Sequence, residues 1–277
     1  MKKINHTILN QIVHHNQSLS IKSKLKGMSY ERCAELPFII ERLKPLFNQK
    51  LEYLDIGSGG ESPLPSYFLK NTNWNITIVD KYKWVRNQIK FAKKSLPDYT
   101  KDRFKIIEKD FISTELDSCK YDIITNISVI EHFEGDTDKT AMEASGKLLK
   151  KDGIYFLTTP MNESYYKEIY VNNDVYGDKA VNKKVFYQRH YDAENVKNRI
   201  ILPSRLKEVQ RIYFGDYDVQ FFEKKWNWPK YLKPFKIFFA WRIHNKACKF
   251  LSYSENPISR ENMNDNTASG VILEMTK

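Results

Sequence analysis

LEYLDIGSGG, at residues 51–60, is the most specific pattern in this 277-residue chain. Its apolar first half predicts a buried strand, and glycines at positions 57, 59 and 60 follow. Glycine has no Cβ and tolerates positive φ, so such a turn lets the backbone come close to a ligand. Ser62 and Pro63 come next and provide a helix start. The stretch therefore predicts the strand, glycine turn and helix that open a nucleotide-binding βαβ unit.

Strands and helices alternate along the chain from this stretch to residue 160. The apolar runs that predict strands lie at residues 51–56, 74–80, 104–111, 121–126 and 154–160. Segments with helical spacing separate them, most clearly at 136–149. This alternation is typical of an α/β, Rossmann-like fold, in which helices cover both faces of a mostly parallel sheet. Later apolar runs at 211–222 and 270–275 predict a sixth and a seventh strand.

The chain divides into two parts at the start of the first strand. Residues 1–50 are predicted to form an N-terminal helical segment, with amphipathic spacing from Ser29 that Pro37 and Pro45 interrupt. Residues 51–277 are predicted to form the main domain. It carries insertions after the fifth strand, at 161–211, and between the last two strands, at 224–260.

Composition excludes several classes of protein. No apolar run approaches the roughly 18 residues that span a bilayer, and no signal-peptide core follows the N-terminus, so a cytoplasmic protein is expected. The three cysteines are far apart, which predicts neither a disulfide framework nor a metal site. The net charge of +11 suits an anionic partner, but lysine outnumbers arginine, and specific nucleic-acid binding is not expected.

Carboxylates at the ends of the second and third strands indicate which nucleotide the glycine turn serves. Asp80 lies about 20 residues beyond the turn, where a carboxylate accepts hydrogen bonds from both ribose hydroxyls. Asp110 and Phe111 end the third strand, where an acid and an aromatic ring can hold an adenine. Ser62 occupies the place of the third glycine of the dinucleotide fingerprint, which argues against an NAD-dependent oxidoreductase.

Together these residues resemble class I S-adenosylmethionine-dependent methyltransferases. The resemblance covers roughly residues 50–160 and includes the 55–59 turn, Val129-Ile130-Glu131-His132 and Lys151-Asp152-Gly153. It implies a seven-stranded sheet whose last strand is antiparallel, and S-adenosyl-L-methionine as the cofactor. The cofactor contacts that it implies are Asp55, Gly57, Ser58, Gly59, Asp80, Lys81, Asp110, Phe111, Asn126 and Ile127.

The acceptor site is expected in the 161–211 insertion, where this family usually builds it. His132 and His190 are the candidate general bases, and each could equally have a structural role. Arg189 is predicted to hold an anionic group of the acceptor, with Tyr187 and Tyr191 beside it.

The 224–260 insertion is basic and aromatic, and three interpretations stay open. Its tryptophans, phenylalanines and lysines could lie in a membrane interface, making the protein peripheral to the inner membrane. They could instead form a helical hairpin over the sheet edge, with lysines reaching out to water. A homodimer interface is the third interpretation.

The resemblance implies a methyltransferase, and its finer features suggest the acceptor. Bacterial enzymes of surface-polysaccharide pathways look similar at residues 57–65 and 188–191. We therefore expect O-methylation of a sugar or other small polar acceptor, in a surface-glycan or secondary-metabolite pathway. A lipid or quinone acceptor at the membrane surface is one alternative. A non-catalytic cofactor-binding protein of the same fold is the other.

Overall fold

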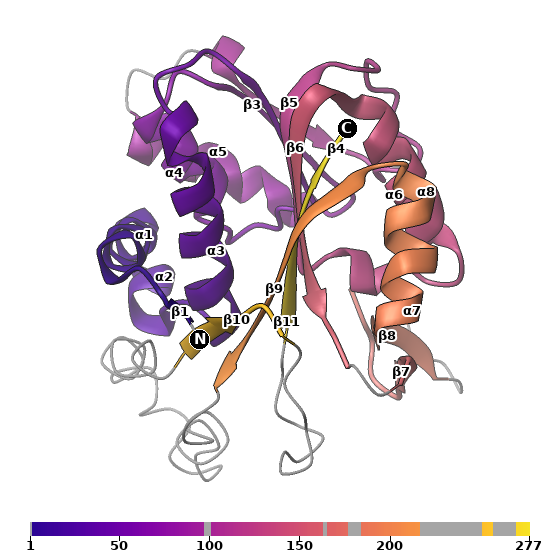
Figure 1. Ribbon diagram of the computed structural model, residues 1–277. Helices are drawn as coiled ribbons and strands as arrows, with labels where there is room; N and C mark the ends of the chain where they lie inside the picture. Colours follow the sequence, from indigo (N-terminus) through magenta and orange to yellow (C-terminus); the bar gives the residue numbers. More distant parts are fainter. Residues whose placement is uncertain (1, 97–100, 163–164, 177–183, 217–250, 257–269) are drawn as a thin grey trace, which may run out of the picture.

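The computed structural model describes residues 2–96, 101–162, 165–176, 184–216, 251–256 and 270–277. A central mixed sheet separates two layers of helices (Figure 1). In the described residues its strand order is β1-β10-β9-β11-β6-β5-β2-β3-β4. The strands of this sheet are β1 (Lys2–Lys3), β2 (Glu52–Ile56), β3 (Asn75–Asp80), β4 (Phe104–Glu108), β5 (Tyr121–Ile127), β6 (Leu149–Pro160), β9 (Lys207–Asp216), β10 (Leu251–Ser254) and β11 (Gly270–Thr276).

The five strands predicted up to residue 160 are present as β2 to β6, and they run parallel. The last strand, β11, is antiparallel to both of its neighbours, β6 and β9, as the family resemblance implied. The predicted count of seven strands is wrong for the described sheet, which has nine. The reason is that β10 pairs with the free edge of β9 and β1 then pairs with β10, two additions that depend on partners far apart in sequence.

The sixth predicted strand begins earlier than expected, at Lys207. Residues 217–222 of that prediction lie outside the described part of the chain, as does most of the 224–260 insertion. Its described residues, 251–256, include strand β10.

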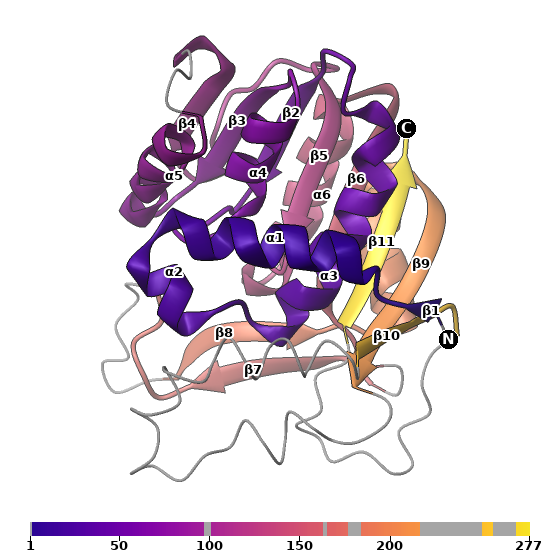
Figure 2. The ribbon, with the colours of Figure 1, turned by 90° about the vertical axis from the view of Figure 1, so that its left-hand side faces the viewer.

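Helices from both halves of the sequence cover the two faces of the sheet (Figure 1). One face carries α3 (Tyr30–Leu43), α4 (Leu64–Asn71) and α5 (Asn87–Ser95), and α1 (His6–Leu19) and α2 (Ile21–Lys26) lie outside them (Figure 2). The other face carries α6 (Thr137–Leu148) and a continuous helical segment made of α7 (Ala193–Asn195), η5 (Val196–Ile201) and α8 (Leu202–Ser204). Short 3-10 turns complete the described structure: η1 (Lys44–Leu46), η2 (Lys83–Arg86), η3 (Lys101–Arg103) and η4 (Ile130–His132).

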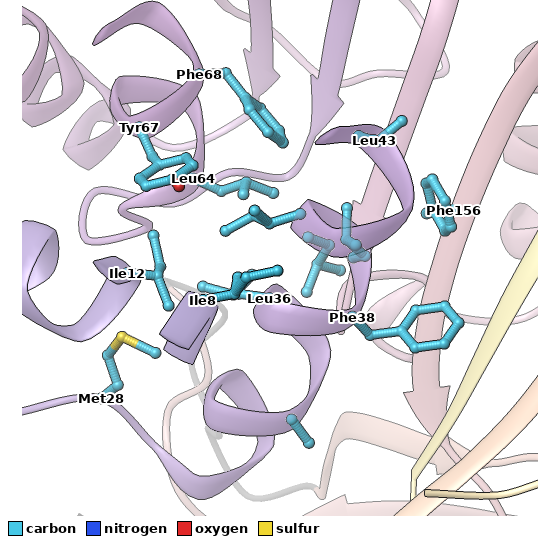
Figure 3. Close-up of a cluster of buried hydrophobic side chains, with 14 of the residues drawn as sticks. Ile8, Ile12, Met28, Leu36, Phe38, Leu43, Leu64, Tyr67, Phe68 and Phe156 are labelled. Carbon is cyan, nitrogen blue, oxygen red and sulfur yellow. The ribbon is translucent and has the colours of Figure 1, made fainter. Parts of the chain in front are cut away.

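The N-terminal helices are part of the core. Ile8 and Ile12 recur at helical spacing on α1 and are buried against Leu36 of α3 and Leu64 of α4 (Figure 3). α3 continues through Pro37 and ends at Leu43. Burying these side chains removes apolar surface from water and fixes the start of α3 relative to the sheet.

A separate antiparallel hairpin, β7 (Lys167–Val171) and β8 (Val185–His190), lies at the carboxyl edge of the parallel strands (Figures 1 and 2). It is joined to the end of β6, because the Asn162 amide donates to the Tyr191 carbonyl at 2.7 Å. Ligands of open α/β sheets bind at this carboxyl edge. Within the described residues, no helix is long and apolar enough to cross a membrane.

Candidate active site

The glycine turn after β2 is open on one side and closely packed on the other. Gly57 has φ +70°, and a Cβ there would lie 2.4 Å from Cγ1 of Val129. Gly59 has φ +63°, and a Cβ there would meet nothing within 4 Å. The turn therefore requires glycine geometry at 57 and leaves room for a ligand at 59.

Asp80 joins the glycine turn to the end of β3. Its two carboxylate oxygens accept hydrogen bonds from the backbone amides of Gly59 and Tyr82, both at 2.8 Å. The side chain is largely buried, and this burial raises its pKa. Each oxygen keeps a further lone pair, so the carboxylate can still accept bonds from vicinal hydroxyls. The neighbouring Lys81 is exposed, with Nζ 4.9 Å from the ring centroid of Tyr82.

Asp55 lies beneath the turn. It accepts hydrogen bonds from Thr125, at 2.5 Å, and from the Ser58 hydroxyl. Burial raises its pKa to about 6. Asp55 and Ser58 therefore hold the turn in shape through contacts within the protein.

The end of β5 places an unused donor beside the turn. Asn126 is paired in register with Ile56 and is fully buried. Its Oδ1 accepts from the Ile130 amide at 3.2 Å, whereas Nδ2 has no partner among the described residues. A buried amide group without a partner is costly, which marks Nδ2 as a donor for a ligand. The carbonyl of the next residue, Ile127, accepts from Arg32 at 3.1 Å.

Asp110 and Phe111 follow β4 and are placed differently from each other. Asp110 is exposed, and its Oδ1 accepts from the Ile112 amide at 2.9 Å. Phe111 is buried in the apolar cluster that also contains Val79. Only Asp110 of this pair presents its side chain to solvent.

A cavity of about 590 Å³ lies at the carboxyl edge. Its walls come from the start of α3, the segment after β5, the end of β6 and the β7–β8 hairpin. Its described lining includes Glu31, Arg32, Glu35, Ser128, Glu131, His132, Tyr165, Lys167, Tyr176, Tyr187, Gln188 and His190. The cavity brings both candidate histidines together.

His132 is held in one tautomer. Its Nδ1 lies 2.7 Å from the carbonyl oxygen of Tyr187, and because a carbonyl only accepts, Nδ1 carries the proton. Nε2 then presents a lone pair. Burial lowers the pKa of the ring, so it is neutral at pH 7. These are the properties of a base that is ready to accept a proton.

His190 lines the same cavity, but its ring nitrogens have different hydrogen-bond partners. Its Nε2 lies 2.9 Å from the amide nitrogen of Gln188, and an amide nitrogen only donates. The Nε2 lone pair of His190 is therefore already used by a neighbour. Of the two histidines, His132 has the better geometry for proton transfer.

Sequence reasoning did not assign a role to Glu131. This side chain is 2% exposed, and its Oε2 has no hydrogen-bond partner in the part of the chain that the structure describes. Burial is the main cause that raises its pKa to about 8. The sequence placed Glu131 in the Val129–His132 segment, which resembles the family, but this pattern does not show that the side chain is buried.

The Arg32–Glu35 pair was also missed, and it fastens α3 to the sheet edge. Arg32 forms an ion pair with Glu35 and donates to the Ser128 hydroxyl at 2.9 Å. Ser128 donates in turn to Glu35 at 2.8 Å and has φ +49°. The N-terminal helical segment thereby supplies one wall of the cavity.

Arg189 and Tyr191 lie on the far side of β8. Arg189 is fully buried and donates to Asp138 at 3.1 Å, while Tyr191 donates to the same carboxylate at 2.9 Å. Neither is among the described residues that line the cavity. Tyr187 does line it and is 36% exposed. Of the three residues predicted to contact the acceptor, the structure therefore brings only Tyr187 to the cavity.

Residues 28–199, more than half of the chain, match a protein family described as "Methyltransferase domain". The chain belongs to this methyltransferase family. The family assignment confirms an S-adenosylmethionine-dependent methyltransferase, as the resemblance in the sequence implied. No curated protein matches the methyltransferase in sequence.

Solved structures with the same fold are distant in sequence. Coclaurine N-methyltransferase, bound to N-methylheliamine and S-adenosylhomocysteine, superposes with a TM-score of 0.60 at 14% identity, covering 98% of this chain and 86% of that one. A putative sarcosine dimethylglycine methyltransferase from Galdieria sulphuraria gives 0.55 at 9% identity, covering 98% of both chains. The 1,6-didemethyltoxoflavin N1-methyltransferase from Burkholderia thailandensis gives 0.54 at 11%, covering 90% and 78%. At these identities the likeness shows the fold.

The strand ends fit S-adenosylmethionine. The open space at Gly59 admits a ligand next to the backbone, and Asp80 lies beside it with acceptor capacity left. Asn126 Nδ2 is a buried donor that a ligand acceptor would satisfy.

Proposed function

We propose that this methyltransferase methylates a hydroxyl group of a small polar acceptor, such as a sugar, bound in the 590 Å³ cavity. The observation that carries the proposal is the state of His132. A hydroxyl must lose its proton as its oxygen gains a methyl group. A neutral imidazole lines the cavity, and its Nε2 has no hydrogen-bond partner among the described residues. The small molecules bound in two structures of the same fold, 1,6-didemethyltoxoflavin and N-methylheliamine, are consistent with a small-molecule acceptor.

Gly57, Gly59, Asp80 and Asn126 would hold the cofactor, with Asp80 toward the ribose hydroxyls. S-adenosylmethionine supplies, when bound, an electrophilic methyl group on a positively charged sulfur. Most of the protein's contribution is then to hold the donor and the acceptor in line. Asp55 and Ser58 act indirectly, because they shape the turn.

His132 Nε2 would take the hydroxyl proton while the methyl group is transferred from the cofactor sulfur to the acceptor oxygen, so that one bond to the methyl carbon breaks as the other forms. The Tyr187 carbonyl keeps Nδ1 protonated and fixes the ring, so Nε2 stays directed to the same place throughout. The imidazolium that forms returns its proton to solvent after product release. His190, paired with Gln188, is assigned to acceptor positioning.

Arg189 and Tyr191 are assigned to the support of the hairpin. Their contacts to Asp138 connect β8 to α6 on the side away from the cavity. The Arg189 side chain is fully buried and is not among the described residues that line the cavity.

The test compares His132→Gln with His190→Gln, using labelled methyl transfer from S-adenosylmethionine to a panel of sugars and sugar nucleotides. His132→Gln should lower kcat by roughly 10²- to 10⁴-fold, while the affinity for S-adenosylhomocysteine stays within about twofold. His190→Gln should act mainly on KM. Turnover that survives in His132→Gln, or label found only outside hydroxyl groups, would contradict the proposal.

A further inference from the structure

Acidic side chains outnumber basic ones around the cavity. Among its described lining residues, Glu31, Glu35 and Glu131 are acidic, and Arg32 and Lys167 are basic. Arg32 is already paired with Glu35. Glu31 and Glu131 then remain, and the other basic residue of the described lining is Lys167, an exposed residue of strand β7.

Glu131 is the member of this set that needs a partner. It is 2% exposed, it lines the cavity, and its Oε2 has no hydrogen-bond donor within the described residues. Burial of a carboxyl group with an unpaired oxygen is costly, and a ligand group that donates a hydrogen bond and carries positive charge reduces that cost. The remaining neighbouring charges act in opposite directions, since Glu35 raises the pKa of Glu131 and Arg32 lowers it.

Aromatic rings complete the wall near this carboxyl group. Tyr176 and Tyr187 flank His132, the residue next to Glu131, with ring centroids 5.3 and 5.5 Å from the imidazole. Tyr165 lines the same cavity. Tyrosine faces attract cations at short range, most strongly where water is excluded. Carboxylate and tyrosine side chains together form a lining that suits a protonated amine better than a neutral or anionic group.

We propose that the acceptor carries a protonated amine that Glu131 recognises, while a hydroxyl of the same molecule meets His132. The acceptor would then be an amino alcohol, for example an amino sugar. This inference rests on the proposed function of the cavity as the acceptor site. The cofactor also carries positive charge, on its ammonium and sulfonium groups, so the experiment must separate the two sources.

Calorimetry on the full chain, saturated with S-adenosylhomocysteine, tests the proposal with glucosamine and glucose as probes. The two sugars differ in one position, which is an ammonium in the first and a hydroxyl in the second. Glucosamine should bind roughly tenfold tighter, which is the effect of one charge-assisted hydrogen bond. Glu131→Gln should reduce this preference to less than about twofold. The exposed Glu134, three residues away and outside the described lining, gives the control: Glu134→Gln should leave the preference unchanged.

Binding of the amine should also release a proton from Glu131 at pH 7, because a cation favours the ionised carboxylate. Titrations in two buffers of different ionisation enthalpy measure this release, which Glu131→Gln should abolish. Equal affinity for the two sugars, or a preference that survives in Glu131→Gln, overturns the inference.

The affinity for the cofactor provides the second arm. If Glu131→Gln weakens binding of S-adenosylhomocysteine or S-adenosylmethionine and not of glucosamine, Glu131 contacts the positive charge of the cofactor. The inference is then wrong. If the unaltered chain binds neither cofactor form, the proposed function itself fails. These outcomes are distinct from loss of the amine preference alone.

Discussion

Asp138 and Arg189 form a fully buried ion pair, and removing either partner should destabilise the fold by different amounts. Arg189 donates to Asp138 and to the Tyr166 hydroxyl, both at 3.1 Å, and to the carbonyls of Phe133 and Gly135. Asp138 also accepts from Arg199, at 2.8 and 2.9 Å. The carboxylate is therefore shared by two guanidinium groups.

Arg189→Met leaves Asp138 paired with Arg199, whereas Asp138→Asn leaves Arg189 charged and buried. In the second case the nearest remaining carboxylate is Glu168, 3.8 Å away and 31% exposed. Breaking a buried pair costs about 3–5 kcal/mol, so we expect about 3 for Arg189→Met and about 5 for Asp138→Asn. At about 2–4 °C per kcal/mol, the melting temperature should fall by about 6–12 °C and about 10–20 °C.

Urea and thermal unfolding followed by circular dichroism measure both effects. Lys139→Met is the matched control, because Lys139 and its partner Asp136 are 40% and 73% exposed and a surface pair contributes less than about 1 kcal/mol. Binding of S-adenosylhomocysteine should persist at temperatures where each variant is folded. The reasoning is refuted if Arg189→Met keeps full stability and loses turnover, which is the behaviour of a residue that holds the acceptor.

Three further predictions concern the cofactor site and the N-terminal helices. Asp80→Ala should weaken S-adenosylhomocysteine binding by roughly 100-fold in calorimetry, because it removes charge-assisted bonds, and intact binding would contradict the ribose assignment. Gly57→Ala should lower the free energy of unfolding by about 2–4 kcal/mol, since it adds left-handed strain and a contact with Val129, and Gly57→Ala/Val129→Ala should recover part of this loss. His15 is buried beside Ser66, and burial lowers its pKa to about 4. The stability that the neutral ring contributes to the fold is therefore complete above pH 6.5 and is lost as the pH falls toward 4. Urea unfolding at pH 7 and pH 4.5 should show a loss of about 2 kcal/mol in the free energy of unfolding that is smaller in His15→Gln; an equal loss in both proteins would show that His15 is not responsible.

The parallel half of the fold could be predicted from the sequence because the patterns that indicate it are local. The turn at 57–60 and the strands β2 to β5 each follow from a few adjacent residues. β6 is longer than predicted, since it starts at Leu149 and continues through the expected break at 150–153, where Asp152 has φ +61°. The extra length begins at Leu149, which pairs with Tyr121 of β5, a contact that no local pattern reveals.

The acceptor side was less predictable because a bulge decides which side chains face the cavity. The β7–β8 register shifts between Ile169 and Tyr170, which pair with Gln188 and Phe186 and leave Tyr187 as the extra residue. A bulge breaks the alternation of side chains along a strand. Tyr187 and Gln188 thus both line the cavity, while Arg189 points away from it. From the sequence alone, Tyr187 and Arg189 were both predicted to contact the acceptor, and the bulge separates them.

The position of β11 has a consequence for how this chain folds. β11 lies between β6 and β9, so in the described sheet β9, β10 and β1 join the parallel strands only through residues 270–276. These residues pair with β6, which ends at Pro160. Bringing Gly270 back to Pro160 closes a long loop, and this costs conformational entropy before any contact is gained. Such long-range pairings slow folding. We expect the strands of the cofactor half to gain protection from hydrogen exchange first, with the outer strands protected only once β11 has been inserted.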